Sequence, residues 1–248
     1  MNRQIKLFSA AMALALAGTA SAATSWTLNT GSVTIGGVTV TATGWANTGS
    51  GSPVGSQLLE QQTLSLYGGG FGITNKDACG TSPCDVSEGN TPEHAIDNNE
   101  RYEMVLLSFS QAVKLQSVKM GWTSNDSDIS VMAYNGPGTG SSSLSGNTWA
   151  GVASAWTSIG NYSDVGTASK AVNGGGVSSS YWLIGAYNPL ANPGGGSVTV
   201  PSSGNYFDYV KLASVTTSPG GSAPLPGTLL LLGTGLLGML SMRKRLAA

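Results

Sequence analysis

The sequence predicts an all-β protein, an antiparallel β-sandwich of the jelly-roll type, enclosed between two processing signals. Glycine is abundant, at 36 of 248 residues, and helix-forming stretches are scarce between Thr24 and Thr217. Short runs of β-branched or alternating apolar residues recur between turn-rich segments. This spacing of strands and turns is typical of antiparallel sandwiches.

The first 22 residues have the features of a secretory signal peptide. Two basic residues precede an apolar run over residues 7–17, and Ala20-Ser21-Ala22 forms a small-residue cleavage site. Cleavage is expected between Ala22 and Ala23. Because the apolar run is too short to span a bilayer, we expect export by the secretion machinery rather than N-terminal anchoring.

The predicted β-sandwich occupies residues 23–215. Without the two ends, the chain keeps 6 of its 11 basic residues and all 12 acidic residues, a net charge of 6 − 12 = −6. Phosphate contacts need Lys and Arg, so this acidic and sparsely charged domain argues against nucleic-acid binding.

Several strands and one helix can be placed by pattern. "SVTIGGVTVTA" has two β-branched runs around Gly36-Gly37 and predicts a hairpin. "YEMVLLSFS" predicts a strand buried on both faces. In "AVKLQSVKMGW" the apolar alternation slips by one residue, which predicts a bulge near Gln116. "DISVMAYN", "YWLIGAYN" and "NYFDYVKLASV" predict later strands, and "SQLLEQQT" is the one plausible helix of the domain.

Cys79 and Cys84 are the two cysteines of the chain. Export implies an oxidising compartment, so a disulfide that closes this short loop is the first expectation. A metal site is the alternative. A structural zinc needs four ligands, and only His94 is near enough in sequence to add a third.

Two loops offer the oxygen ligands that calcium prefers. Asp97 and Asn98 lie in the first loop, and Asp126 and Asp128 lie in the second, each just before a predicted strand. Neither loop matches the EF-hand pattern. Asx turns, in which Asp and Asn bond nearby backbone N–H groups, are the alternative. We therefore predict no cofactor other than a structural calcium ion at these residues.

Trp149 and Trp156 are the candidates for carbohydrate binding, because aromatic faces stack on sugar rings. They lie in a region rich in glycine and serine, where exposure is expected. Core packing is the alternative for these and the other aromatic residues.

No residue pattern predicts catalysis. His94 is the single histidine, and no G-x-S-x-G nucleophile elbow accompanies it. The nearby carboxylates of Glu100 and Glu103 do not specify a glycosidase pair. We therefore expect no enzyme activity, and a secreted hydrolase is the third hypothesis after a surface protein and a carbohydrate-binding module.

The C-terminal end has three parts in order. A linker rich in proline, glycine and serine covers residues 216–223, and Pro224-Leu225-Pro226 follows it. Next comes an apolar run over residues 228–242, and the last part is the basic cluster Arg243-Lys244-Arg245. As a helix the run covers about 22 Å, less than the roughly 30 Å hydrocarbon core, so it predicts one short and marginal transmembrane helix.

This order resembles the PEP-CTERM sorting signal of bacterial surface proteins processed by an exosortase. The usual Glu of the Pro-Glu-Pro motif is replaced by Leu225. Residues 94–134 and 179–189 also resemble conserved blocks of the exosortase-dependent extracellular proteins. The resemblance makes residues 224–248 a sorting signal; a permanent tail anchor is the alternative.

The resemblance implies a non-enzymatic protein of a Gram-negative bacterium. Its expected partners are the secretion machinery, an exosortase, transiently the inner membrane and, as a further hypothesis, exopolysaccharide. Its expected destination is the outer surface or the biofilm matrix.

Overall fold

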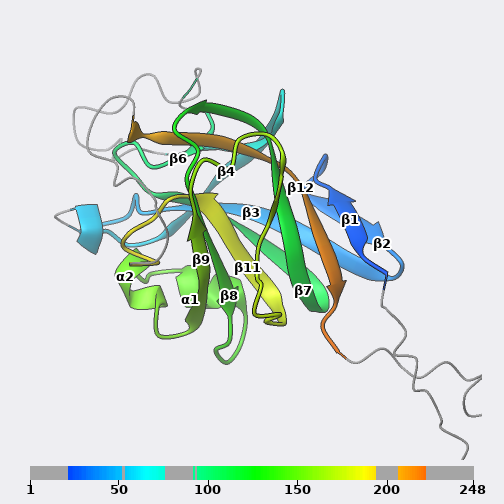
Figure 1. Ribbon diagram of the computed structural model, residues 1–248. Coiled ribbons are helices and arrows are strands. Elements are labelled where there is room, and N and C mark those ends of the chain that lie inside the picture. Colours follow the sequence, from blue (N-terminus) through cyan, green and yellow to red (C-terminus); the bar gives the residue numbers. More distant parts are fainter. Residues whose placement is uncertain (1–21, 52–53, 76–91, 93, 194–205, 222–248) are drawn as a thin grey trace, which may run out of the picture. The chain divides into compact units, whose positions relative to one another are not determined.

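Strands dominate the computed structural model (Figure 1), which describes residues 22–51, 54–75, 92, 94–193 and 206–221. The strands are β1 (Thr24–Thr27), β2 (Ser32–Ile35), β3 (Val38–Ala46), β4 (Glu60–Tyr67), β5 (Gly70–Thr74), β6 (Ile96–Asp97), β7 (Glu103–Asn125), β8 (Ile129–Tyr134), β9 (Trp156–Tyr162), β10 (Ser169–Ala171), β11 (Ser179–Ala186) and β12 (Asp208–Pro219). The helical segments are short: the 3-10 turn η1 (Val54–Ser56) and the helices α1 (Gly140–Leu144) and α2 (Trp149–Val152). None of the helices in these described ranges is long and apolar enough to cross a membrane.

All the strand ladders are antiparallel and belong to one sheet, in the order β1-β12-β5-β4-β3-β7-β11-β8-β9. An additional β12–β7 pairing closes part of the sheet on itself. The predicted all-β antiparallel class is confirmed. One continuous sheet forms the layers of the expected sandwich. The predicted C-terminal transmembrane helix lies outside the described residues.

The long strand β7 joins the two sides of the fold. Its first part pairs with β3 and β11, and its second part pairs with β12 and β10. It bends back near its middle, where Val113 pairs with both Ser179 of β11 and Pro219 of β12. Figure 1 shows the two arms of β7 meeting at this bend.

Two local predictions are confirmed. β2 and β3 form a hairpin through Gly36 and Gly37, both with positive φ (58° and 80°) as a tight two-residue turn requires. The register between β12 and β7 shifts where Thr216 pairs with Ser117 and Thr217 pairs with Leu115. Gln116 is therefore the extra residue of a bulge, which keeps the apolar residues on either side of it facing inward.

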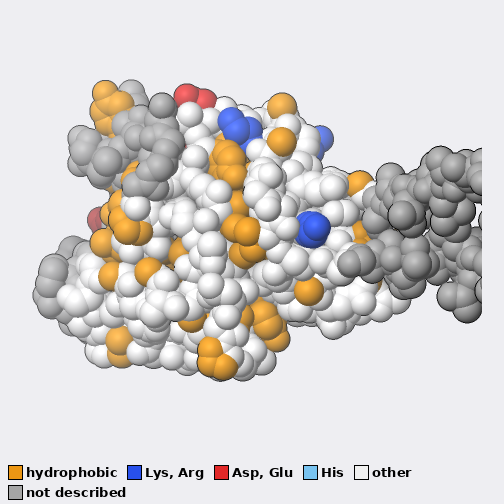
Figure 2. Space-filling view, turned by 60° about the horizontal axis from the view of Figure 1, so that its bottom comes forward, with side chains coloured by type: hydrophobic (Ala, Val, Ile, Leu, Met, Phe, Trp, Pro, Cys, Tyr) orange, Lys and Arg blue, Asp and Glu red, His pale blue; other side chains and the backbone are white. Residues whose placement is uncertain are grey.

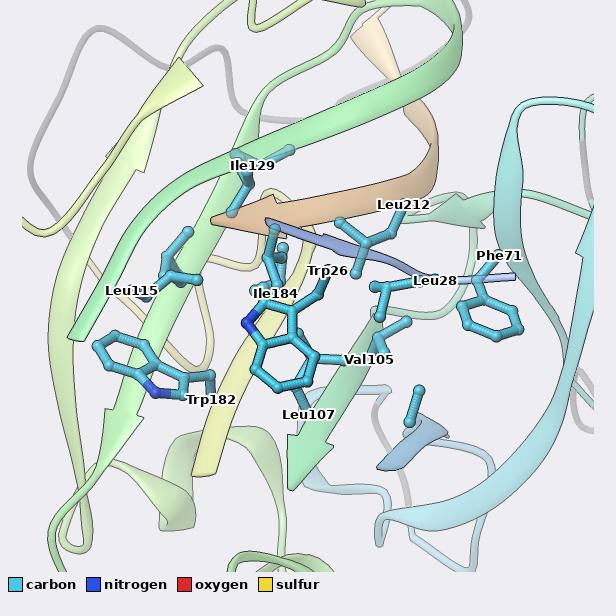
Figure 3. Packing of buried hydrophobic residues seen from close by; sticks show 14 of the residues in the cluster. Trp26, Leu28, Phe71, Val105, Leu107, Leu115, Ile129, Trp182, Ile184 and Leu212 are labelled. Carbon is cyan, nitrogen blue, oxygen red and sulfur yellow. The ribbon is translucent and has the colours of Figure 1, made fainter. Parts of the chain in front are cut away.

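The principal core lies inside the closed part of the sheet. It gathers apolar side chains from β1, β3, β5, β7, β8, β11 and β12. Figure 3 shows Trp26 among Val105, Leu107 and Ile184 at its centre. Trp26 also donates a hydrogen bond from Nε1 to Thr217 Oγ1 at 2.9 Å, so the first strand is tied to the last by both packing and a buried polar contact.

A second core lies on the other face of β3, β7, β8 and β11, where α1 and α2 cover it. Alternate residues of β8 serve the two cores: Val131 packs in the first and Met132 in the second. The prediction of a helix in "SQLLEQQT" is wrong, since Glu60–Thr63 begin strand β4. The helices instead follow Thr139 and Thr148, whose side chains cap their first turns.

Candidate functional site

Acidic side chains meet at one end of the sheet. β7 begins there at Glu103 and returns there at Asn125, which pairs with Asp208 at the start of β12. β6 joins the same end, because Asp97 pairs with Tyr209 and its N–H donates to Glu103 Oε2 at 3.1 Å. We call this the acidic end, defined by Asp97, Glu103, Asp126, Asp128 and Asp208.

Three carboxylates form the centre of the acidic end. Asp126, Asp128 and Asp208 each offer an oxygen, and these oxygens lie within 4.8 Å of one another. Asp128 and Asp208 are buried, and Asp126 is half-buried. The backbone places them together, because Asp126 follows the end of β7 and forms an isolated parallel bridge with Asp208.

Hydrogen bonds hold Asp208 in place. Its Oδ1 accepts from Asp128 N, and its Oδ2 accepts from Asn98 Nδ2, each at 2.6 Å. Asn98 Oδ1 in turn accepts from Asp208 N at 2.9 Å. Asp128 Oδ1 accepts from Asp164 N at 2.8 Å, which ties the loop after β9 to the same group.

The pKa of Asp208 is raised from 3.8 to about 8, chiefly by burial and in addition by the nearby charges of Asp128 and Asp126. The hydrogen bonds from Asp128 N and Asn98 oppose this rise without cancelling it. Without a counter-ion, Asp208 therefore keeps a proton at neutral pH, which relieves the repulsion within the group.

The donor set fits a hard cation, since calcium is bound by carboxylate oxygens drawn from loops. The structure brings together Asp126 and Asp128 of the four residues predicted as ligands, and Asn98 contacts the group through Asp208. Asp97 is not part of the three-carboxylate group; its Oδ1 accepts from Asn99 N at 3.0 Å. Calcium binding itself stays a prediction.

Sequence reasoning missed Asp208. The signal was present, because Asp208 directly precedes the apolar run of a strand, as Asp128 also does. Asp208 and Asp128 are 80 residues apart along the chain, so no local pattern indicates that their carboxylates lie close together.

The single histidine contacts a lysine. Lys211 Nζ lies 2.9 Å from His94 Nε2, within hydrogen-bond distance, and both residues are buried. The amine also lies 4.4 Å from the ring centre of Trp122 and 5.2 Å from that of Tyr67. Burial lowers the pKa of Lys211. This cluster ties β12 to the β4–β5 hairpin.

The prediction that Trp149 and Trp156 are exposed is wrong. Their exposed fractions are 0 % and 3 %, because both rings pack in the second core beneath α1 and α2. Their indole N–H groups are also used: Trp149 donates to Tyr102 O and Trp156 to Ser143 Oγ, each at 2.9 Å. Neither ring can stack on a sugar in this structure.

A cleft of about 400 Å³ lies beside the second core. Its lining comes from the β3–β4 connection and the turn between α1 and α2: Trp45, Gly49, Ser50, Leu58, Leu59, Glu60, Gln61, Ser145 and Gly146. It combines apolar walls with hydroxyl, amide and carboxylate groups.

The residues of the processing signals fall mostly outside the described part. Ala22 and Ala23, at the predicted signal cleavage site, are exposed just before β1. The pair Cys79 and Cys84, the motif Pro224-Leu225-Pro226 and the cluster Arg243-Lys244-Arg245 all lie outside the described residues.

Comparison with known families decides the nature of the C-terminal end. Residues 222–245 match the model of the PEP-CTERM protein-sorting motif. The chain carries a PEP-CTERM sorting motif. This motif implies export, a membrane-anchored sorting signal in a Gram-negative bacterium, and processing by an exosortase. No curated protein and no solved structure matches the chain.

Proposed function

We propose that the β domain is a non-enzymatic surface or biofilm-matrix protein that an exosortase sorts through the PEP-CTERM motif. The observation that carries the proposal is the match of residues 222–245 to this motif, directly after the β domain. The final destination of the processed protein, at the outer surface or in the extracellular matrix, belongs to the proposal.

The boundaries of the folded part support this function. Residues Ala22–Ser222 form one compact unit. The first strand begins at Thr24, and the last backbone hydrogen bond of the described chain runs from Gly220 N to Ala112 O at 3.1 Å. Removal of both signals therefore takes away no strand and no core residue of the part of the chain that the structure describes.

The chemistry of the buried polar groups supports a non-enzymatic role. His94 Nε2 contacts an amine rather than a serine hydroxyl. Asp128 and Asp208 are 1 % and 0 % exposed, and their oxygens accept bonds from backbone and side-chain donors. Groups held in this way favour a structural role over attack on a substrate.

Binding of exopolysaccharide is the second candidate function, and the cleft is the observation that favours it. Gln61 is exposed and Glu60 is half-buried at its rim, and such polar groups hydrogen-bond sugar hydroxyls. A pull-down with purified exopolysaccharide tests this candidate. Gln61→Ala should reduce retention, whereas Gln116→Ala, which is exposed outside the cleft, should leave it unchanged. Equal retention of both variants counts against the cleft.

The leading proposal is tested by the intact mass of the protein from native cells and from cells without the exosortase. We expect loss of both ends in native cells, with the C-terminus near Pro226, and retention of the tail without the enzyme. A C-terminus at Ala248 in both strains would make the tail a permanent anchor and would refute the sorting proposal.

A further inference from the structure

Both ends of the chain leave the β domain at the same place. β1 and β12 are antiparallel, and Thr24 pairs with Thr217. The chain therefore enters β1 beside the point where it leaves β12. The bend of β7 and the start of β11 lie there too, since Val113 pairs with Pro219 and Ser179. We call this the exit end, defined by Thr24, Ala112, Ser178 and Gly220.

The exit point of the C-terminal tail is fixed by close packing. A Cβ atom on Gly220 would lie 2.1 Å from Ser178 Oγ and 2.6 Å from Ala112 O. Contacts this short are not tolerated, so Gly220 allows the backbone to sit directly against these neighbours. The folded part of the chain thus reaches to within four residues of Pro224.

The acidic residues lie at the opposite end. β12 runs from Asp208 at the acidic end to Pro219 at the exit end. The second arm of β7 is antiparallel to it and runs from Val113 at the exit end to Asn125 at the acidic end. The described acidic residues are Glu60, Asp97, Glu100, Glu103, Asp126, Asp128, Asp164 and Asp208. Glu60 belongs to the acidic end because Ala46 pairs with both Glu60 and Glu103. Glu100 lies in the chain between Asp97 and Glu103, and Asp164 N donates to Asp128 Oδ1.

The exit end is polar and holds no described acidic residue. Gln111, Ala112 and Ser178 are exposed there, and the nearest described charge is Lys114, which pairs with Ser218. Figure 2 shows a face on which charged side chains are few and most of the surface is uncharged. Within the described residues, negative charge is thus confined to the end away from both chain exits.

The connection to the predicted transmembrane run is short. Seven residues separate Gly220 from Thr228, so the link has eight Cα–Cα steps and is at most about 28 Å long even when fully extended. The twelve residues of β12 alone span about 40 Å. The link is therefore shorter than the distance between the two ends of the domain.

We propose that, while the tail is in the membrane, the exit end faces a bilayer that carries anionic lipid and the acidic end points away from it. The negative surface potential of such a bilayer repels the acidic end and does not repel the exit end, where the described charge is the basic Lys114. Because the N-terminus leaves at the same end, the domain can take this orientation both before and after removal of the signal peptide. The inference rests on the sorting function proposed above.

Fluorescence quenching on vesicles tests this orientation. The full-length precursor is reconstituted in vesicles of mixed phosphatidylglycerol and phosphatidylcholine that contain a spin-labelled lipid quencher. A fluorophore is attached at Gln111→Cys at the exit end or at Thr167→Cys beside the acidic end, with Cys79 and Cys84 replaced by Ser. Thr167 is exposed and follows Gly166, whose N–H bonds Ser127 Oγ at 3.2 Å. Melting temperatures confirm that the labelled proteins are folded.

We expect quenching at Gln111→Cys to exceed quenching at Thr167→Cys several-fold. Equal quenching, or stronger quenching at Thr167→Cys, would overturn the proposal. On vesicles of phosphatidylcholine alone the difference should shrink, and an undiminished difference would overturn its electrostatic basis.

Charge reversal at the exit end provides a matched control. Ala112→Glu with Ser178→Glu should lower quenching at Gln111→Cys on anionic vesicles. Ser169→Glu should not, because Ser169 is exposed and pairs with Lys119, midway along the second arm of β7. The vesicles contain no exosortase, so these results do not depend on whether the tail is cleaved. Failure of the orientation is thereby separated from failure of the sorting function, which the intact mass reports.

Discussion

Asp208 is the residue on which the acidic end depends. Its carboxylate is buried, accepts bonds from two neighbours and lies beside two other carboxylates. A bound proton or a bound cation can reduce the repulsion among these carboxylates. The two alternatives predict different dependences of the free energy of unfolding on pH. Since the protein is exported, pH and calcium outside the cell are the conditions that matter for this group.

The protonated form predicts that the fold loses stability as pH rises. The folded pKa of Asp208 is about 8 and its ordinary value is 3.8, so the folded state holds a proton that the unfolded state releases between these values. The stabilisation is complete below about pH 4 and is lost as pH rises through 8, by at most about 1.4 kcal/mol per pH unit.

Urea denaturation with a chelator present, from pH 5 to pH 9, measures this dependence of the free energy of unfolding on pH. Asp208→Asn, which does not titrate, should flatten it; an unchanged slope in this variant would assign the effect to another group.

Calcium binding should instead raise the stability of the folded state at high pH, where loss of the Asp208 proton would lower it. An ion bound by Asp126, Asp128 and Asp208 would displace the proton, stabilise the folded state and weaken the pH slope. Millimolar calcium should therefore raise the melting temperature at pH 8, and Asp126→Asn should reduce the shift. Magnesium is the control ion, because it demands a smaller and more regular site. No calcium-dependent shift in the wild-type protein would remove the calcium hypothesis.

At the scale of elements, the bulge at Gln116 lets the apolar side chains on both sides of it face the principal core while β7 stays paired with β12. Val113 and Leu115 precede Gln116, Val118 and Met120 follow it, and all four apolar side chains face the principal core. Without an extra residue the two pairs would point to opposite faces, because side chains alternate along a strand.

Deletion of Gln116 should therefore be tolerated. The shortened strand alternates regularly, and its apolar residues stay inward on both sides of the deletion. The hydrogen bond from Val172 N to Gln116 O is lost, so a cost of about 1 kcal/mol is expected. Deletion of Lys119 is the matched control, because it turns Met120 to the outer face and should prevent folding. Urea denaturation compares the two, and equal destabilisation would contradict the role of the bulge.

At the scale of the whole molecule, the described domain holds its strands and both cores between residues 22 and 221. The closed part of the sheet supplies the core, and the first and last strands pair with each other before the chain leaves. The chain enters and leaves the described domain at exposed residues of the exit end, Ala22 and Gly221. We therefore expect that removal of the residues on either side of this domain leaves its fold intact.

A fragment of residues 23–221 should fold on its own. It retains the strands and both cores of the described domain, so its unfolding should be cooperative and its melting temperature should lie within a few degrees of that of the full-length precursor in detergent. Circular dichroism during heating measures both. A fragment that stops at residue 212 is the control, because it loses most of the β12 pairing with β7 and β1. A molten fragment 23–221 would show that the ends contribute to the fold.

Local features of the sequence were sufficient to predict the strand class, the Gly36-Gly37 hairpin, the Gln116 bulge and the sorting motif. The first three depend on residues that are neighbours along the chain, where backbone preferences and side-chain alternation act directly. The sorting motif follows from the resemblance of the C-terminal end to a known sorting signal. Only the tertiary structure reveals that Asp208 joins Asp126 and Asp128, that Trp149 and Trp156 are buried, and that both chain ends leave the domain opposite the described acidic residues. These relations arise from strand pairings between distant segments, and such pairings are decided by how the whole sheet closes around its core.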